Sequence, residues 1–134
     1  MRFEVENKPP VEGPSARRVR AGILNLRSHG RSSFATLTDE RGNYLLAAGG
    51  ALTCMLERRD VDAGRMLRAF VDKPGVTVPD GTILAFGAGQ IRLLADEWLT
   101  APQVAEAFDA FLHGHPWPAI LRWRDQGDVL PRTE

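Results

Sequence analysis

Two histidines, His113 and His115, are spaced as an H-x-H pair, which can bind one metal ion when it lies on an extended segment. The residues around them predict the end of a helix, where the helix dipole favours a protonated histidine in any case. The chain contains three histidines and one cysteine, and no second cluster of such residues accompanies the pair. We therefore expect no bound metal and no other cofactor.

The single thiol, Cys54, has no histidine close to it in the sequence. A catalytic thiol needs a neighbouring base or cation that lowers its pKa, so a buried structural cysteine is the favoured interpretation. The glycine-containing segments 47–50 and 87–90 are followed by predicted strands. A phosphate-binding loop requires a following helix, so these segments are interpreted as turns.

Polar residues of the predicted sheet offer one arrangement that could serve catalysis. Arg122 and Arg124 share a face of a predicted strand, and paired arginines suit a carboxylate or phosphate substrate. A salt-bridged sheet surface explains the same residues equally well. A small α+β enzyme acting on an anionic substrate is therefore an alternative, with a candidate cluster of Glu57, Arg58, Arg59, Arg122, Arg124 and Asp125.

Charge narrows the classes of partner. The 134 residues include 17 basic and 17 acidic side chains, so no net charge draws the protein to nucleic acid or to a membrane. The arginines between residues 17 and 31 lack the interleaved aromatic residues of a nucleic-acid site. Residues 1–31 hold seven of the basic and three of the acidic side chains, so the remainder is mildly acidic and suits a basic partner.

Cysteine usage and hydropathy indicate the compartment. A lone cysteine is typical of a reducing environment, and no stretch approaches the length of a membrane span. We therefore expect a soluble, cytoplasmic protein that contacts neither membrane nor nucleic acid.

Most of the chain before residue 99 predicts antiparallel strands. Residues 1–16 are rich in proline and glycine and predict an irregular lead-in, and residues 17–98 are expected to be mostly β. Apolar patterning and intervening turns predict a meander, with strands over 19–27, 34–38, 44–48 and 51–58.

Two further segments complete this region. Residues 65–71 fit either a short helix or a strand, and Gly64 favours the strand because glycine destabilises a helix. Residues 82–86 and 90–94 flank a glycine-rich turn and predict a second hairpin.

The clearest element is a helix within residues 99–114. Thr100 and Gln103 have the spacing of a capping box, and Gly114 followed by Pro116 is a typical helix end. One face carries an apolar stripe of Val104, Phe108, Phe111 and Leu112.

Residues 115–134 then predict a terminal strand and a tail. The predicted fold is α+β, a single domain over residues 1–134 in which an antiparallel sheet of about six strands, a meander, carries one C-terminal helix on one face.

This helix–strand unit resembles a family of immunity proteins from bacterial polymorphic toxin systems. The matching features are the aromatic helix, the small residue that ends it, the following prolines and a terminal strand with tryptophan: Val104, Ala107, Phe108, Phe111, Gly114, Pro116, Pro118, Leu121, Arg122 and Trp123. The resemblance implies a non-enzymatic protein that neutralises a cognate toxin by direct binding, as a monomer or homodimer.

The expected contact surface surrounds the end of this helix. Trp117 is either an exposed interface anchor or a lid packed on the helix end, and the sequence leaves both open. Acidic residues could supply negative charge toward a basic partner. The candidate partner-binding residues are Trp117, Asp39, Glu40, Asp96, Glu97 and Asp125. A homo-oligomeric structural subunit that pairs through an open sheet edge is a further alternative.

Overall fold

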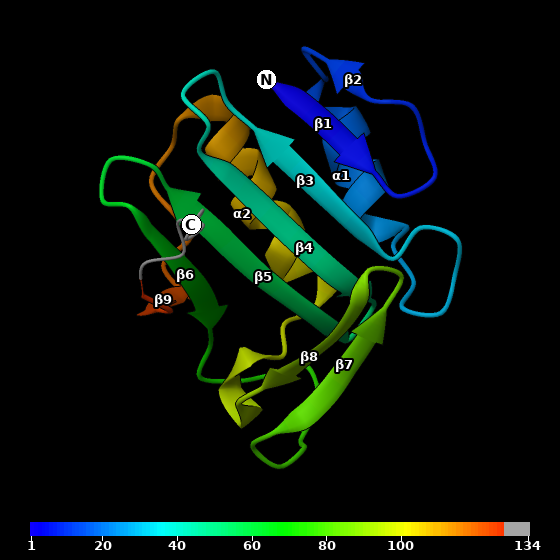
Figure 1. Cartoon of the computed structure of the whole chain (residues 1–134), viewed down its shortest axis with the longest axis vertical. Coiled ribbons are helices and arrows are strands. Elements are labelled where there is room, and N and C mark those ends of the chain that lie inside the picture. Colours follow the sequence, from blue (N-terminus) through cyan, green and yellow to red (C-terminus); the bar gives the residue numbers. More distant parts are fainter. Residues whose placement is uncertain (128–134) are drawn as a thin grey trace, which may run out of the picture.

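A seven-stranded antiparallel sheet, in the order β2-β1-β3-β4-β5-β6-β9, carries both helices on one face in the computed structural model (Figure 1). A two-stranded sheet, β7-β8, stands on the opposite face. The structure describes residues 1–127, so the predicted tail beyond them lies outside the described residues. Within that range the class is α+β, as predicted.

The strands are β1 (Arg2–Val5), β2 (Val11–Glu12), β3 (Phe34–Thr38), β4 (Tyr44–Gly50), β5 (Thr53–Asp60), β6 (Arg65–Phe70), β7 (Thr82–Phe86), β8 (Gly89–Leu93) and β9 (Arg122–Asp125). The helices are α1 (Ala16–Leu24), the short 3-10 helix η1 (Ala95–Glu97) and α2 (Ala101–His113). Within the described residues the main sheet thus has seven strands where about six were expected, and α1 adds a second α-helix.

Helix α1 replaces the strand predicted over residues 19–27, and that prediction is wrong. The Ser15 hydroxyl accepts from the Arg18 backbone N–H at 3.1 Å and caps the helix. Val19 and Ile23 are buried while Ala21 between them is exposed. Val19 and Ile23 are four residues apart, which places both on one face of a helix. The same spacing also fits the alternation of a strand, so the apolar residues alone do not distinguish the two.

The lead-in is not irregular. β1 pairs with β3, and β2 pairs with β1, so two short strands within residues 1–16 form the outer part of the main sheet. Phe3 is buried in the core. Pro9 and Pro10 lie in the turn between the two strands, where a missing N–H breaks no ladder hydrogen bond. The prolines indicate an irregular segment, and β2, with only two residues, is too short to give a strand pattern in the sequence.

The hairpin of β3 and β4, the strand β6 and the helix α2 are confirmed. Thr100 Oγ1 accepts from the Gln103 N–H at 3.3 Å, and Gln103 Oε1 accepts from the Thr100 N–H at 2.8 Å. Gly114 ends α2 with a φ of 68°, a left-handed conformation that suits glycine.

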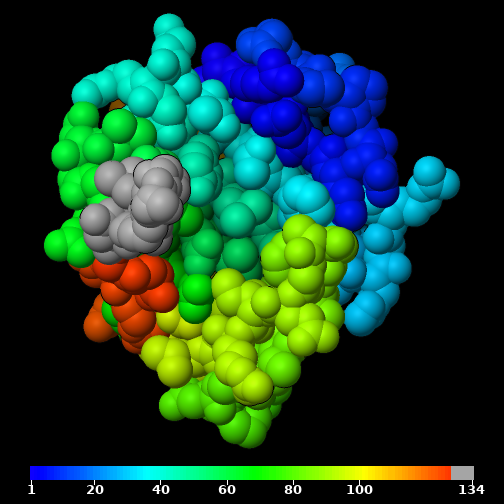
Figure 2. Space-filling view, viewed as in Figure 1, coloured from blue at the N-terminus to red at the C-terminus, as the bar shows by residue number. Residues whose placement is uncertain are grey.

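Two apolar clusters hold the layers together. Both helices and the sheet enclose the larger one, in which Phe108, Ile23 and Leu45 are fully buried. The smaller one lies beneath β7 and β8 and includes Met55, Leu84 and Trp98. Figure 2 shows this hairpin standing forward of the sheet. Within residues 1–127 no helix combines the length and apolar character needed to cross a bilayer.

Candidate functional site

The strand register divides the polar residues of β5, β6 and β9 between the two faces of the main sheet. Glu57 lies opposite Arg68, and Arg68 lies opposite Arg124, on the face that the α-helices leave open. The next row, Arg58 opposite Leu67 opposite Asp125, has the reverse orientation and belongs to the helix side. The six residues considered as one cluster for an anionic substrate therefore do not form a single site.

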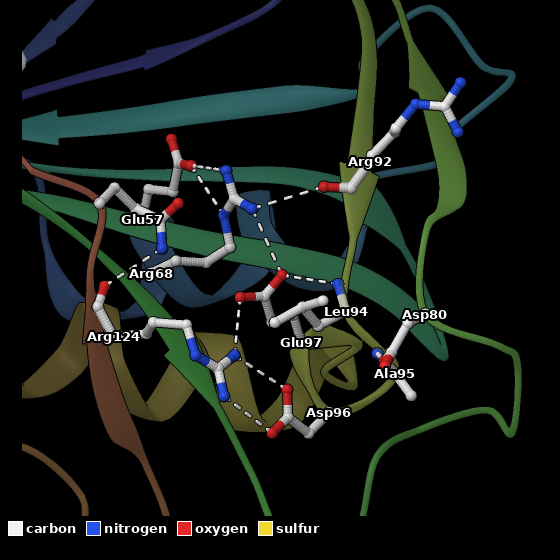
Figure 3. Close-up of polar contacts among 10 residues, drawn as sticks. Glu57, Arg68, Asp80, Arg92, Leu94, Ala95, Asp96, Glu97 and Arg124 are labelled. Atoms are coloured by element: carbon white, nitrogen blue, oxygen red, sulfur yellow. Dashed lines mark hydrogen bonds and ion pairs between the residues drawn. The ribbon is translucent and has the colours of Figure 1, made fainter.

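On the open face, five side chains form a continuous ion-pair network (Figure 3). We call it the open-face network: Glu57, Arg68, Asp96, Glu97 and Arg124. Arg68 donates to Glu57 at 2.6 and 2.9 Å and to Glu97 at 3.3 Å. Arg124 donates to Glu97 at 2.8 Å and to Asp96 through two bonds of 3.0 Å. Each guanidinium therefore meets two carboxylates of its own chain.

Glu97 is the centre of this network. Its side chain is 1% exposed, and it also accepts from the backbone N–H of Leu94 at 2.8 Å. The expectation that Glu97 presents charge to a partner is wrong, because the carboxylate is buried against two arginines. It joins η1 to strands β6 and β9 and so holds the start of α2 against the sheet.

Asp96 lies at the margin of the same network, with 40% of its side chain exposed. The hydrogen bonds from Arg124 hold the pKa of the Asp96 carboxyl below its usual value, and the same bonds raise the pKa of Arg124. These charges are neutralised within the protein. The arrangement stabilises the fold and leaves neither arginine ready for an external anion.

On the helix side, a second set of residues surrounds a different arginine. We call it the aromatic cluster: Arg58, Phe111, Trp117 and Trp123. The Arg58 guanidinium carbon lies 5.2 Å from the ring centroid of Trp117 and 4.8 Å from that of Trp123. The two indoles meet edge to face at 5.1 Å, and Trp117 stacks on Phe111 at 6.0 Å. Such contacts are favourable cation–π and aromatic geometries.

Arg58 has unused hydrogen-bonding capacity. Its guanidinium makes no hydrogen bond within the described residues, its Nε is buried without a partner, and the nearest carboxylate, Asp60, is 3.9 Å away. Burial lowers the pKa of Arg58, with Asp60 acting in the opposite direction. One fifth of the side chain remains exposed. Arg58 is thus a partly desolvated cation whose remaining donors can meet an incoming acceptor.

Beside this cluster, the end of α2 opens into a shallow depression of about 520 Å³. Trp117 and Asp39 both line it, so the fold brings together two of the predicted contact residues from opposite ends of the sequence. The rest of the lining comes from Met1 and the last turn of α2 with the residues after it: Ala110, Phe111, Leu112, His113, Gly114 and His115. Trp117 is half-buried, so it acts both as a lid on Phe111 and as part of this surface.

The acidic residues differ in what they can offer to a partner. Asp39 accepts from the backbone N–H groups of Arg41 and Asn43 at 2.8 and 3.0 Å, so it mainly orders the β3–β4 turn. Glu40 beside it is exposed. Asp125 lies 3.8 Å from Arg65 and is exposed, on the sheet row that contains Arg58. Asp96 and Glu97 lie on the other face.

The remaining candidates are the histidine pair and the single cysteine. The rings of His113 and His115 stack at 5.3 Å, and His113 Nδ1 lies 3.4 Å from Asp109. Among residues 1–127 no group of three or more His, Cys, Asp or Glu side chains is placed to hold a metal ion. Cys54 is buried, and burial raises the pKa of its thiol to about 12, which keeps it protonated near neutral pH.

Two groups of interacting residues were not predicted from the sequence. Arg68 belongs to the open-face network, and its alternation with Ala69 on β6 was a usable signal for the face it occupies. The contact of Arg58 with two tryptophans had no such signal, because it joins β5 to residues far along the chain. Comparison with protein-family models gives no match, and comparison with curated proteins gives no significant match either.

Proposed function

We propose that this is a non-enzymatic binding protein that neutralises a cognate bacterial toxin by direct contact. The docking surface is the end of α2, where the depression lies beside the aromatic cluster. The observation that carries the proposal is the partly exposed Arg58 between Trp117 and Trp123, with donors that no described residue uses.

Residue types at this surface support binding. Tryptophan and arginine are enriched among the residues that dominate protein interfaces, and the strongest of them sit in well-packed pockets. Trp117 stacks on Phe111, so its orientation is fixed before a partner arrives. A fixed side chain loses less conformational entropy on binding than a mobile one.

The charges at the end of α2 indicate which chemical groups a partner must present there. The carbonyl end of α2, Asp39 and Glu40 favour basic groups, whereas the free donors of Arg58 favour an oxygen acceptor. A matching partner surface combines basic side chains with one carboxylate or carbonyl placed over Arg58. Such a mixed pattern restricts the choice of partner more than net charge does.

Two alternatives receive less support. An enzyme for anionic substrates needs an available arginine pair, yet Arg124 is paired with Asp96 and Glu97, and Arg122 forms an ion pair with Asp72 at 3.2 Å. A homo-oligomer through a sheet edge would use β2, which has two residues, or β9, which has four. Short edge strands are a common defence against such pairing. A cytoplasmic location completes the proposal, since an immunity protein must meet its toxin inside the cell.

The test is co-expression with the product of the adjacent gene, followed by affinity capture and a growth-rescue assay. We expect a stable one-to-one complex and rescue of growth by the wild-type protein. The matched variants are Trp117→Ala, at the proposed surface, and Ile120→Ala, an exposed apolar residue outside the depression.

Trp117→Ala should lose rescue, while Ile120→Ala should retain it. If the neighbour proves toxic and the wild-type protein neither binds it nor restores growth, the proposal fails. If binding persists in Trp117→Ala, the function stands but the surface is misplaced.

A further inference from the structure

A groove of about 320 Å³ runs between α1 and the turn that joins β1 to β2. It shares no lining residue with the depression at the end of α2. Its floor is apolar, formed by Phe3, Val5 and Val11. Gly22 lets the backbone of α1 lie directly on this floor, because a Cβ at that position would stand 2.8 Å from the Phe3 ring.

The wall of the groove that faces α1, formed by the turn between β1 and β2, is rigid. Pro9 and Pro10 have fixed φ angles, and the turn before them is held by two hydrogen bonds. The Lys8 N–H donates to the Val5 carbonyl at 3.0 Å, and the Asn7 amide donates to the Arg31 carbonyl at 2.6 Å. The groove is therefore formed before any ligand arrives, which lowers the entropic cost of binding.

Two cations stand at the rim without acidic partners. Lys8 and Arg18 form no ion pair and no side-chain hydrogen bond among residues 1–127. Other basic side chains on the same elements are paired. Arg2 on β1 pairs with Glu12 at 2.7 Å, and Arg20 on α1 pairs with Glu106 at 3.2 Å. Within the described residues, unpaired positive charge thus remains on both sides of the apolar floor, from Lys8 in the β1–β2 turn and from Arg18 on α1.

We propose that this groove binds a small amphipathic carboxylate. The apolar part of the ligand lies on Phe3 and Val5, and its carboxylate accepts from Lys8 Nζ and the Arg18 guanidinium. The volume is near the lower end of ordinary ligand sites, which span about 300–1,000 Å³, so it suits an acid of roughly eight to ten carbon atoms. This site is separate from the proposed toxin-binding surface and does not depend on it.

The experiment is calorimetric titration of the full chain with octanoate and, in parallel, with octan-1-ol, which has the same tail and no charge. We expect saturable one-to-one binding of octanoate, and binding of the alcohol about tenfold weaker because charge-assisted hydrogen bonds are absent. Backbone amide shifts should change at Lys8, at Val11 and at residues 18–25, and the end of α2 should remain unaffected.

Variants separate the groove from general adsorption. The double change Lys8→Gln and Arg18→Gln should reduce octanoate affinity to that of octan-1-ol. Ala21→Trp places a large side chain in the groove and should abolish binding of both octanoate and octan-1-ol. If Ala21→Trp does not fold, Ala21→Leu replaces it as the groove-filling variant. Arg17→Gln, an exposed neighbour on α1 that does not line the groove, should bind like the wild type.

Three results would overturn the proposal. Octanoate affinity unchanged in the double variant would show that the cations take no part. Binding retained in both groove-filling variants would place the ligand elsewhere. Association with phosphatidylglycerol vesicles in the absence of octanoate binding would assign the basic rim to a lipid surface, which contradicts a small-molecule groove.

Discussion

Arg68 and Arg58 lie on adjacent strands of one sheet and have opposite surroundings. Arg68, on the open face, is paired with Glu57 and Glu97, and both carboxylates are largely buried. Arg58, on the helix side, is enclosed by Trp117 and Trp123 and lies 3.9 Å from its nearest carboxylate. The first arginine is neutralised within the fold, whereas the second keeps donors that are not used.

That difference separates a structural role from a binding role. A buried ion pair is strongly destabilised when one partner is removed, because the other charge stays buried and unpaired. Arg58 is held mainly by aromatic rings, and its one nearby carboxylate, Asp60, is 3.9 Å away and about one third exposed, so removal of Arg58 strands no buried carboxylate. Charge satisfied internally therefore indicates a part of the molecule that holds the fold, and charge left unsatisfied indicates a part that meets a ligand.

The largest expected effect is that of Arg68→Met on stability. It leaves the largely buried Glu57 without a cation and Glu97 with Arg124 alone, so the free energy of unfolding should fall by about 3–5 kcal/mol. Urea denaturation followed by circular dichroism measures this loss. Arg20→Met is the control, since its ion pair with Glu106 is about half exposed and should contribute below about 1 kcal/mol. Equal losses for both variants would remove the distinction between the two kinds of arginine.

Trp117→Ala tests the binding side of the comparison. Loss of a central aromatic anchor should weaken the complex with the toxin by about 2 kcal/mol or more, mostly through faster dissociation. Surface plasmon resonance measures the rate. The loss of unfolding free energy should be smaller than that of Arg68→Met, because Trp117 is only half-buried. An unchanged dissociation rate would exclude Trp117 as an anchor.

Arg58→Met should have little effect on the fold. The variant loses two cation–π contacts of about 0.5–1 kcal/mol each but also removes the cost of burying an unpaired Nε. We therefore expect the free energy of unfolding to change by less than about 1 kcal/mol. A loss close to that of Arg68→Met in the same urea experiment would mean that the aromatic cluster is as structural as the open-face network.

Acid should weaken the open-face network in a predictable direction. Asp96 has a folded-state pKa below its ordinary value, so its contribution is present at neutral pH and is lost as pH falls through the lowered pKa. Because 40% of the side chain is exposed, we expect less than about 1 kcal/mol. Wild type and Asp96→Asn should therefore differ in unfolding free energy at about pH 7 and converge as the pH falls through the lowered pKa. A constant difference across that range would assign the effect to packing.

The smallest effect concerns an exposed charge. Glu40→Gln should slow association with a basic toxin by roughly threefold at low salt and have little influence on dissociation. The effect should disappear at high ionic strength, where exposed charges are screened. Stopped-flow association at two salt concentrations measures it. Asp39 is unsuitable for this test because its carboxylate orders the β3–β4 turn.

Local signals predicted some elements well. The cap formed by Thr100 and Gln103 and the glycine end of α2 depend on neighbours in sequence, and both are confirmed. The β3–β4 hairpin and β6 follow from short turns and alternation. Helix α1 was missed because the spacing of Val19 and Ile23 fits two periods, and tertiary packing decides between them.

The arrangement of the site depended on contacts between distant segments. The sequence predicts Glu97 as a contact residue at the surface, yet Arg68 and Arg124 enclose its carboxylate. The β7–β8 hairpin was predicted, but its place on the sheet depends partly on Ser33, whose hydroxyl accepts from the Gly87 N–H at 2.7 Å. Neither contact leaves a pattern in the local sequence.

The most direct test measures one variant, Arg58→Met, in two ways. The account predicts dissociation from the toxin at least about tenfold faster than for the wild type, because the partner loses the unused donors of Arg58. It predicts, for the same sample, an unfolding free energy within about 1 kcal/mol of the wild type. Unchanged dissociation together with a loss of about 3 kcal/mol or more in stability would contradict it, since Arg58 would then hold the fold as Arg68 does.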